Sequence, residues 1–358
     1  MPVQNYENLD INTDVTTTRT MLHEVIPMTG SIFLHNTGAY SDNNIKNFTH
    51  GMFQSVYDYP YLSSSANHIF DITMGYDETS ALSSSSSTQN AKKINNYNQM
   101  SQVLLGYEDG TANTVRMFEK DLLLDKTGSM GACFFINFSR LLIKDQIKKG
   151  SFSITLGSGS DYGTPFSDVL VLTDASASAT AGTTNTVGGD YGILFQADGG
   201  TGRPHGLIFY QAGVVVLSTS SVAPASAFRV IDNENLYPPS GDANTYIDAT
   251  MSGSSISGAC DALRHRIQNI SFNNTTEINS KIYFCRVPHN KYNYSSNPTY
   301  TNNSKIRVKE VASDTPRAYI TTVGLYNSSN ELLATAKLSE PLMKDPSGEL
   351  ILRVRLDY

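Results

Sequence analysis

The sequence predicts a mainly β fold with a few helices, an α+β chain with antiparallel sheets or a sandwich that ends in a β-hairpin and a terminal strand. Charged residues make up only 16% of the 358 residues. Polarity therefore comes mostly from Ser, Thr, Asn and Tyr, which favours strands and turns over long surface helices. Several segments alternate apolar and polar residues, whereas helical spacing is confined to two or three segments. The hydrophobic content of 39% is enough for a substantial core.

The N-terminal third predicts strands and one clear helix. Residues 1–20 are polar and suit an extended arm, residues 31–40 have strand-like content, and residues 66–76 alternate as a strand does. The segment "TQNAKKINNYNQMSQVLLG" predicts a helix over residues 88–106 that Gly106 can end. The expected buried stripe of this helix recurs at spacings of three or four residues and consists of Ile94, Tyr97, Met100 and Leu104.

The middle of the chain predicts further strands around a long polar segment. "ACFFINFSRLL", residues 132–142, predicts an apolar strand that turns helical, and residues 150–157 resume strand alternation. Residues 158–206 are rich in Gly, Ser, Thr, Ala and Asp, and within them residues 173–190 predict a long surface loop or an exposed hairpin tip. The apolar run 207–217 predicts a buried strand.

A second helix is predicted near residues 254–270, "SSISGACDALRHRIQNI". Its apolar face would contain Ile256, Leu263, Ile267 and Ile270. The short basic runs 144–150 and 264–266 are expected on the solvated sides of helices. A strand over residues 280–287 and a Tyr- and Asn-rich loop over residues 288–304 follow.

The stretch "AYITTVGLYNSSNELLATAKL", residues 318–338, predicts a β-hairpin with a turn at "NSSN". Strict alternation places Tyr319 and Tyr326 on opposite faces of its first strand. The returning strand would have a single apolar face made of Leu332, Ala334, Ala336 and Leu338. The last residues, "ELILRVRLDY", alternate between an apolar face and a face with Arg353 and Arg355, and such a strand can present an open sheet edge.

These patterns divide the chain into four segments. Residues 1–65 form an N-terminal arm with the first strands, and residues 66–157 form an α+β segment. Residues 158–252 form a Gly/Ser/Thr-rich β region with long loops, and residues 253–358 form a helix followed by a C-terminal β module.

Composition argues against several classes of protein. The net charge of −7 and the scattered Lys and Arg residues argue against direct binding to nucleic acid, which needs a concentrated basic face. Three distant cysteines without ligand spacing argue against a disulfide framework or a zinc site. No apolar run approaches the roughly 18 residues of a membrane span, and no secretory signal opens the sequence. We expect synthesis and folding in the cytoplasm.

No motif in the sequence indicates catalysis or cofactor binding, and we expect neither an enzyme nor a bound cofactor or metal. "GSGSDYG" lacks the strand and helix of a nucleophile elbow. "GGTGRPHG", residues 199–206, lacks the GK[ST] ending of a phosphate loop. "LTDASASATAG" and "YEDGTANT" lack the ligand spacing of a calcium loop. The paired carboxylates of a polysaccharide hydrolase remain an open alternative, because they can be distant in sequence.

Four blocks of the sequence resemble a known family in the same order. They are "FDITMGY…STQNAKKINNYNQMSQVLLGY", "FFINFSRLLIKDQIKKGSFSITL", "HGLIFYQAGVVVL" and "YITTVGLYNSSNELLATAKLSEPL…LILRVRLDY". Together they resemble structural proteins of tailed bacteriophages, especially cyanophage-type myoviruses, and "VGLYNSSNELLATA" is similar to the attachment modules of phage tail fibres. The resemblance covers most of residues 69–358 and implies a virion component.

The resulting expectation is a homo-oligomeric structural protein of the virion, in the tail, baseplate or neck, assembled in the host cytoplasm with other phage structural proteins. The alternatives are a receptor- or glycan-binding tail-fibre or tip protein, a polysaccharide hydrolase, and a capsid decoration protein. Tyr and Asn suit a binding surface, although the same tyrosines can pack as an ordered structural loop. The candidate interaction residues are Tyr292, Tyr294, Tyr300, Tyr319, Tyr326, Arg353 and Arg355.

Overall fold

The described part of the chain divides into two compact units. Unit 1 contains Met1–Met21 and Glu277–Tyr358, and unit 2 contains Leu22–Thr276. The expected strand at residues 31–40 and the side chain of Tyr300 lie outside the described residues. The computed structural model describes residues 6–28, 42–84, 88–108, 114–119, 130–157, 165–167, 169–175, 184–185, 187–197, 204–219, 255–294, 301–302, 305–306, 313 and 315–358.

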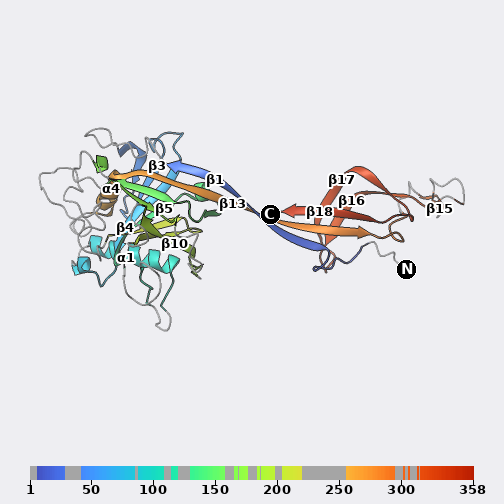
Figure 1. The fold of residues 1–358 in the computed structure, drawn as a ribbon, viewed down its shortest axis with the longest axis horizontal. Coiled ribbons are helices and arrows are strands. Elements are labelled where there is room, and N and C mark those ends of the chain that lie inside the picture. Colours follow the sequence, from blue (N-terminus) through green and yellow to red (C-terminus); the bar gives the residue numbers. More distant parts are fainter. Residues whose placement is uncertain are drawn as a thin grey trace. The chain divides into compact units, whose positions relative to one another are not determined.

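The fold is mainly β with a few helices and large antiparallel sheets, which confirms the predicted class (Figure 1). In unit 2 each strand pairs antiparallel with its neighbour in the order β7-β8-β10-β11-β12-β5-β4-β3-β2. The bounds are β2 (Ile45–Asn47), β3 (Gln54–Tyr57), β4 (His68–Tyr76), β5 (Ala132–Phe138), β6 (Gln146–Ile147), β7 (Ser153–Gly157), β8 (Val169–Thr173), β9 (Thr184–Asn185), β10 (Gly189–Gln196), β11 (Pro204–Phe209) and β12 (Val214–Ser218).

Two longer helices pack on β4. Helix α1 (Thr88–Leu104) confirms the predicted helix, and Gly106, with φ of +80°, follows its end. A Cβ atom at Gly75 of β4 would lie 2.5 Å from the Lys93 carbonyl oxygen, so glycine is what lets α1 approach this strand. Helix α4 (Ile256–Arg266) contacts β4 through Cys260, whose Sγ donates to the Ile72 carbonyl at 3.5 Å. The remaining helical segments are α2 (Arg140–Ile143), η1 (Asp42–Asn44), η2 (Ala81–Ser84) and η3 (Pro165–Ser167).

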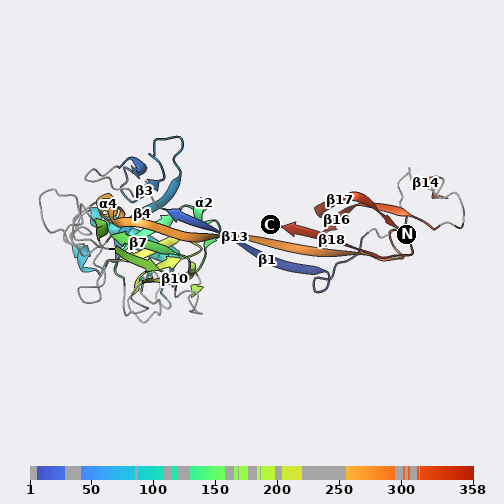
Figure 2. The same ribbon diagram turned by 45° about the horizontal axis from the view of Figure 1, so that its top comes forward.

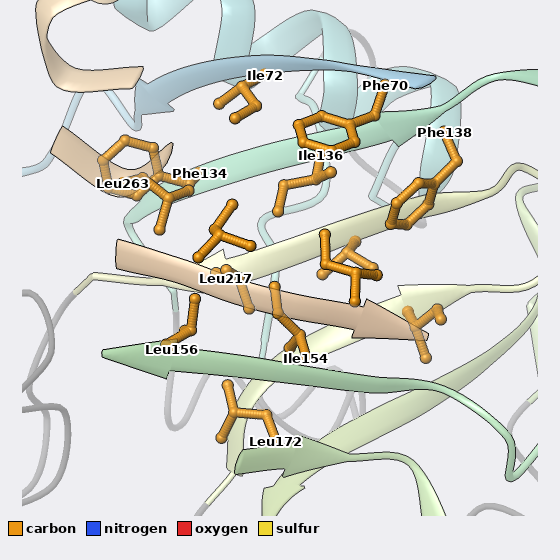
Figure 3. Packing of buried hydrophobic residues seen from close by; sticks show 14 of the residues in the cluster. Phe70, Ile72, Phe134, Ile136, Phe138, Ile154, Leu156, Leu172, Leu217 and Leu263 are labelled. Atoms are coloured by element: carbon orange, nitrogen blue, oxygen red, sulfur yellow. The ribbon is translucent and has the colours of Figure 1, made fainter. Parts of the chain in front are cut away.

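The core of unit 2 occupies both faces of this sheet. Alternate residues of β5 belong to two separate apolar clusters: Phe134 and Ile136 to one, Cys133 and Phe135 to the other. The first cluster includes Leu263 of α4, and in it side chains of β4 and β5 meet those of β7 and β8 (Figure 3). The second includes Tyr97 of α1. Unit 2 therefore has the interior that its apolar strand patterns predict.

Several local expectations for unit 2 are wrong. Residues 207–217 form two strands, β11 and β12, which a turn before Gly213 separates, because Gly213 has φ of +67°. The basic run 144–150 lies in β6 and a turn rather than on a helix. Arg264 and Arg266 are buried, not solvated. Charge alone therefore did not indicate which side of α4 faces the core.

The two buried arginines have partners in unit 2. Arg264 donates to Gln54 Oε1 at 3.3 Å and pairs with Asp261 at 3.0 Å, and burial lowers its pKa to about 9. Arg266 donates to the Gly157 carbonyl at 3.3 Å. The residues Ile267 and Ile270, expected on the helix, are buried at the start of the next strand instead.

Two strands contribute residues to both units. They are β1 (Val15–Met28) and β13 (Ile267–Val287), which are neighbours in the sheet. The N-terminal segment expected as an arm therefore enters a strand from Val15 onward and pairs within its own chain. A hydrogen bond from Phe284 N to the Asp14 carbonyl, at 2.9 Å, anchors the start of this pairing in unit 1.

Strands of three separate sheets lie in unit 1. In one, β13 lies between β1 and β18 (Leu350–Asp357), with register from Ser280↔Asp357 to Val287↔Leu350. In another, β16 (Ala318–Tyr326) pairs only with β17 (Leu332–Lys344) among the described strands, and both lie beside β18 (Figures 1 and 2). A short pair, β14 (Thr301–Asn302) and β15 (Lys305–Ile306), completes the unit. The terminal strand thus joins β13 and not the hairpin.

None of the helices in the described ranges is both long and apolar enough to cross a membrane.

Candidate functional site on the C-terminal hairpin

The tip of the β16–β17 hairpin is built around one asparagine. Asn327 Oδ1 accepts hydrogen bonds from the backbone N–H groups of Ser329 (2.9 Å) and Glu331 (2.8 Å), and its Nδ2 donates to Glu331 Oε2 at 2.7 Å. Asn330 takes the left-handed conformation, with φ of +63°, which asparagine tolerates better than most residues. The turn predicted at "NSSN" is confirmed, and side-chain bonds hold it in one conformation.

Two irregularities change which residues share a face of the hairpin. The register passes from Ile320↔Leu342 to Thr322↔Lys337, so that residues 338–341 oppose a single residue of β16. Pro341 lies in this interval and has no N–H to donate to a ladder. Near the tip the register passes from Leu325↔Ala334 to Tyr326↔Leu332, which leaves Leu333 as a bulge.

These irregularities overturn the face assignments made by strict alternation. In the first part of β16, Ala318 is buried and Ile320 is half-buried. After the irregularity, the half-buried residues are Val323 and Leu325. Tyr319 and Tyr326, expected on opposite faces, are therefore both exposed on the same side. Leu332 is likewise exposed and does not join Ala334, Ala336 and Leu338 on the half-buried side.

The exposed side of the hairpin, which we call the outer hairpin face, has apolar residues at both ends. Tyr319 lies opposite Met343 at one end, and Tyr326 lies opposite Leu332 at the other. A Cβ atom at Gly324 would lie 2.9 Å from the Tyr326 ring and 3.3 Å from the Leu332 side chain, so both side chains cover this glycine. The exposed fractions are 61% for Tyr319, 57% for Tyr326, 53% for Leu332, 68% for Leu333 and 47% for Met343.

The middle of the outer hairpin face is polar. Thr322 lies opposite Lys337, and Gly324 lies opposite Thr335, and all four are exposed. The face therefore runs from an apolar pair through a polar centre to a second apolar pair. Exposed apolar side chains grouped in this way, unlike single scattered ones, mark an interaction surface.

The candidate residues of β18 lie on another sheet. Arg353 and Arg355 are exposed, while Leu352 and Val354, which alternate with them, are buried, as alternation predicts. Arg355 Nε donates to Asp357 Oδ1 at 2.7 Å, and its guanidinium also donates to Ser280 Oγ at 3.0 Å. The Ser280 hydroxyl and then Arg355 hold the pKa of Asp357 below its usual value. Arg355 therefore has a local partner in its own chain.

The candidate tyrosines after β13 lie in a loop that a buried lysine holds. Lys344 Nζ, at the end of β17, donates to the His289 carbonyl (3.2 Å), Asn293 Oδ1 (2.8 Å) and the Asp345 carbonyl (2.6 Å). Within this loop Tyr292 is half-buried with φ of +59°, and Tyr294 is 50% exposed. Burial, and then the Glu7 carboxylate, raise the pKa of Tyr292.

The predicted interaction residues thus fall into three groups. Tyr319 and Tyr326 come together on the outer hairpin face, Arg353 and Arg355 share the exposed face of β18, and Tyr292 and Tyr294 belong to the loop that Lys344 holds. Sequence reasoning missed Leu332, Leu333 and Met343. The presence of Pro341 within β17 was the one local signal that the alternation is interrupted.

One described cluster in unit 2 contains the residue types of a catalytic triad. Ser55 Oγ donates to Asp71 Oδ1 at 2.5 Å, and His68 Nε2 lies 2.8 Å from the same oxygen. In a triad the histidine lies between the nucleophile and the acid, where it can take the nucleophile's proton. Here the aspartate lies between the serine and the histidine, so this arrangement does not activate Ser55.

The buried Asp174 of unit 2, which falls in one of the acidic segments considered for calcium, has a structural explanation. Its carboxylate accepts from Gly150 N, Phe152 N and the Tyr210 hydroxyl, each at 2.8 Å. Burial raises its pKa although these three bonds oppose the shift. Asp174 therefore ties the start of β7 to the turn after β11. Across the described ranges, His, Cys, Asp and Glu side chains form no group that could hold a metal ion.

No family model, curated protein or solved structure matches the chain.

Proposed function

We propose that this chain is a structural component of a tailed-phage virion that acts through contacts between subunits. Its partners would be copies of itself and other phage structural proteins, in the tail, baseplate or neck. The observation that carries the proposal is the outer hairpin face, where five apolar side chains are about half exposed or more. A sheet face of this kind gains free energy when a partner removes it from water.

The architecture of unit 1 supports the same proposal. An isolated two-stranded hairpin is marginally stable in water, and it normally needs further strands or a packed face. The β16–β17 sheet has only its half-buried side packed in the chain, while its other side remains open. Assembly would cover that side. The four sequence blocks that resemble phage structural proteins support a tailed-phage particle, and the proposed location is the virion after assembly in the host cytoplasm.

In this proposal the chain performs no chemical step, uses no cofactor and does not contact nucleic acid directly. The chain acts through assembly contacts, because preformed sheet faces bury apolar surface between subunits and thereby fix the positions of the subunits. The net charge of −7 agrees with a role that avoids the phosphate backbone.

The experiment that tests the proposal is the protein composition of purified particles. Mass spectrometry of gradient-purified virions should detect the chain in a stoichiometric amount, and a cryo-electron map should place it in the tail, baseplate or neck. A particle preparation that lacks the chain would overturn the proposal. Deletion of residues 318–344 should then reduce the yield of complete particles. As a control, deletion of a capsid gene should leave the folding of this chain unchanged.

A second candidate, recognition of a host receptor or glycan, rests on the loop that contains Tyr294. Three hydrogen bonds from Lys344 preorganise this loop, and Tyr294 offers a half-exposed aromatic surface with a polar tip. Under this alternative a Tyr294→Ser variant would assemble into particles normally but adsorb poorly to host cells. Normal adsorption by such particles would remove this candidate.

A further inference from the structure

We infer that the outer hairpin face pairs with the same face of a second copy of this chain, about a two-fold axis that runs along the strands. This inference rests on the proposed function, since it specifies the partner and the surface of one assembly contact. Contacts between identical copies are commonly two-fold and use the same patch on both subunits. Such a contact requires a face that is complementary to itself.

The register of the hairpin makes the face self-complementary. A two-fold axis along the strands places β16 of one copy over β17 of the other. Tyr319 then lies over Met343 of the second copy, and Tyr326 lies over Leu332, so that apolar residues cover apolar residues at both ends. In the centre Lys337 lies over Thr322, whose hydroxyl oxygen can accept a hydrogen bond from the ammonium group.

The other two-fold arrangement of these faces is disfavoured. An axis across the strands would place β17 over β17 of the second copy and bring Lys337 near its own equivalent at the polar centre. Two ammonium groups taken out of water without a counter-charge repel each other. The charge at Lys337 therefore selects the axis along the strands.

The distribution of charge favours unit 1 as the place where identical copies touch. Unit 1 holds 12 Lys and Arg against 11 Asp and Glu, a net charge of +1, and unit 2 holds 14 against 22, a net charge of −8. Identical surfaces of unit 2 would meet with a large like charge, whereas unit 1 carries almost none. Unit 1 as a whole therefore has little net charge with which to select a strongly acidic or basic partner.

The exposed apolar area is also sufficient for a contact between two copies. Each of the five side chains exposes about half of its surface or more, so together they expose on the order of 500 Å². Two copies would remove about 1,000 Å² from water, which is the lower limit for a specific interface.

The first test is the mass of the full-length chain in solution, by light scattering coupled to size exclusion. The unmodified chain should have the mass of a dimer, and Leu332→Glu or Tyr326→Glu should reduce it to a monomer or raise the dissociation constant at least about tenfold. Ile351→Glu is the matched control, because Ile351 is 66% exposed in the same unit but lies on β18, and its mass should stay dimeric. Circular dichroism should be unchanged in all three variants.

A second test identifies the axis through disulfide formation under mild oxidation. A mixture of the Thr322→Cys and Lys337→Cys variants should form a cross-linked dimer, whereas either variant alone should not. Cross-linking by Lys337→Cys alone would instead indicate the axis across the strands and would overturn the inference. The unmodified chain controls for Cys285, which is half-buried, and for the buried Cys133 and Cys260.

Failure of this inference and failure of the proposed function would give different results. A chain that is present in particles but monomeric or trimeric in solution, or dimeric with no response to Leu332→Glu and Tyr326→Glu, would overturn the inference alone. A chain that dimerises as described but is absent from particles would overturn the proposed function alone.

Discussion

The two units of this protein differ in where they place their apolar side chains. In unit 2 two clusters cover both faces of the sheet, and residues such as Phe70, Phe135 and Phe209 have no exposed surface. In unit 1 the described apolar residues that count as buried still expose 6–9% of their surface: Ala318, Val287, Val354, Ile282 and Leu352. Beside them the outer hairpin face remains open. Unit 2 is stabilised by its interior, whereas unit 1 has little interior of its own.

The two units are held together by different interactions. Burial of apolar area contributes roughly 25 cal/mol per Å², so unit 2 has a large internal source of stability. Unit 1 depends more on polar anchors, such as Lys344 at the end of β17 and the Asn327 turn at the hairpin tip. The unit with the weaker interior is the one that offers its apolar side chains to a partner.

The largest expected effect is in the interior of unit 2. Phe135→Ala removes a fully buried ring that contacts Phe118, with ring centres 5.6 Å apart, and should destabilise unit 2 by about 3–5 kcal/mol. Hydrogen exchange followed by mass spectrometry should show faster exchange throughout β4, β5 and β12. Peptides from the hairpin should exchange as before. An equal acceleration in both units would contradict separate interiors for unit 1 and unit 2.

A smaller effect is expected at the polar anchor of unit 1. Lys344→Met leaves the carbonyls of His289 and Asp345 and the Asn293 amide without their donor, and should destabilise unit 1 locally by about 2 kcal/mol. The same exchange experiment should show opening of residues 288–294 and of the end of β17. Lys337→Met, on the same strand but exposed, is the matched control and should leave these peptides unchanged in a monomeric background.

The pH dependence of unit 2 offers a third comparison. Burial lowers the pKa of Lys93 to about 8, from about 10.4 in an unfolded chain. Between these values the unfolded state binds more protons, so this lysine makes folding more favourable as pH rises from about 8 to 10.4 and costs stability below that range.

Lys93→Met should therefore increase the free energy of unfolding at pH 7 by about 1 kcal/mol, and this advantage should fall away by about pH 10. The measurement is urea unfolding of both proteins across this range, reported as their difference. Taking the difference between the two proteins removes the contribution of Cys133, which both contain. Burial raises the pKa of the Cys133 thiol, so this residue lowers the free energy of unfolding at high pH. A difference that did not change with pH would contradict the assigned burial of the ammonium group.

The smallest expected effect on the monomer lies on the outer hairpin face. Tyr319→Ser and Leu332→Ser should each change the free energy of unfolding of the monomer by less than about 0.5 kcal/mol, because each side chain is more than half exposed. Unfolding at concentrations too low for association would measure this. A decrease of more than about 1 kcal/mol in the free energy of unfolding would mean that these residues stabilise unit 1 itself. Unit 1 would then resemble unit 2 in using its apolar side chains for its own stability.

Features that depend on neighbouring residues could be predicted from the amino-acid sequence. The period of two in "FDITM" and "LILRVRL" predicts β4 and the faces of β18, and the spacing of Tyr97 and Leu104 predicts α1. The Asn-rich turn predicts the hairpin tip. In each case the steric preferences of the backbone and the side-chain spacing of a strand or helix act over a few residues, so a short window contains the information.

The pairing of distant strands, and the sides of them that remain exposed, depend on how the whole chain packs. β13 joins β1 from the start of the chain and β18 from its end, and no local pattern specifies such distant partners. The interruption near Pro341 and the bulge at Leu333 bring Tyr319, Tyr326 and Leu332 to one face. The register depends on both strands and on the surfaces that they cover. It is therefore a property of the packed sheet and not of either strand alone.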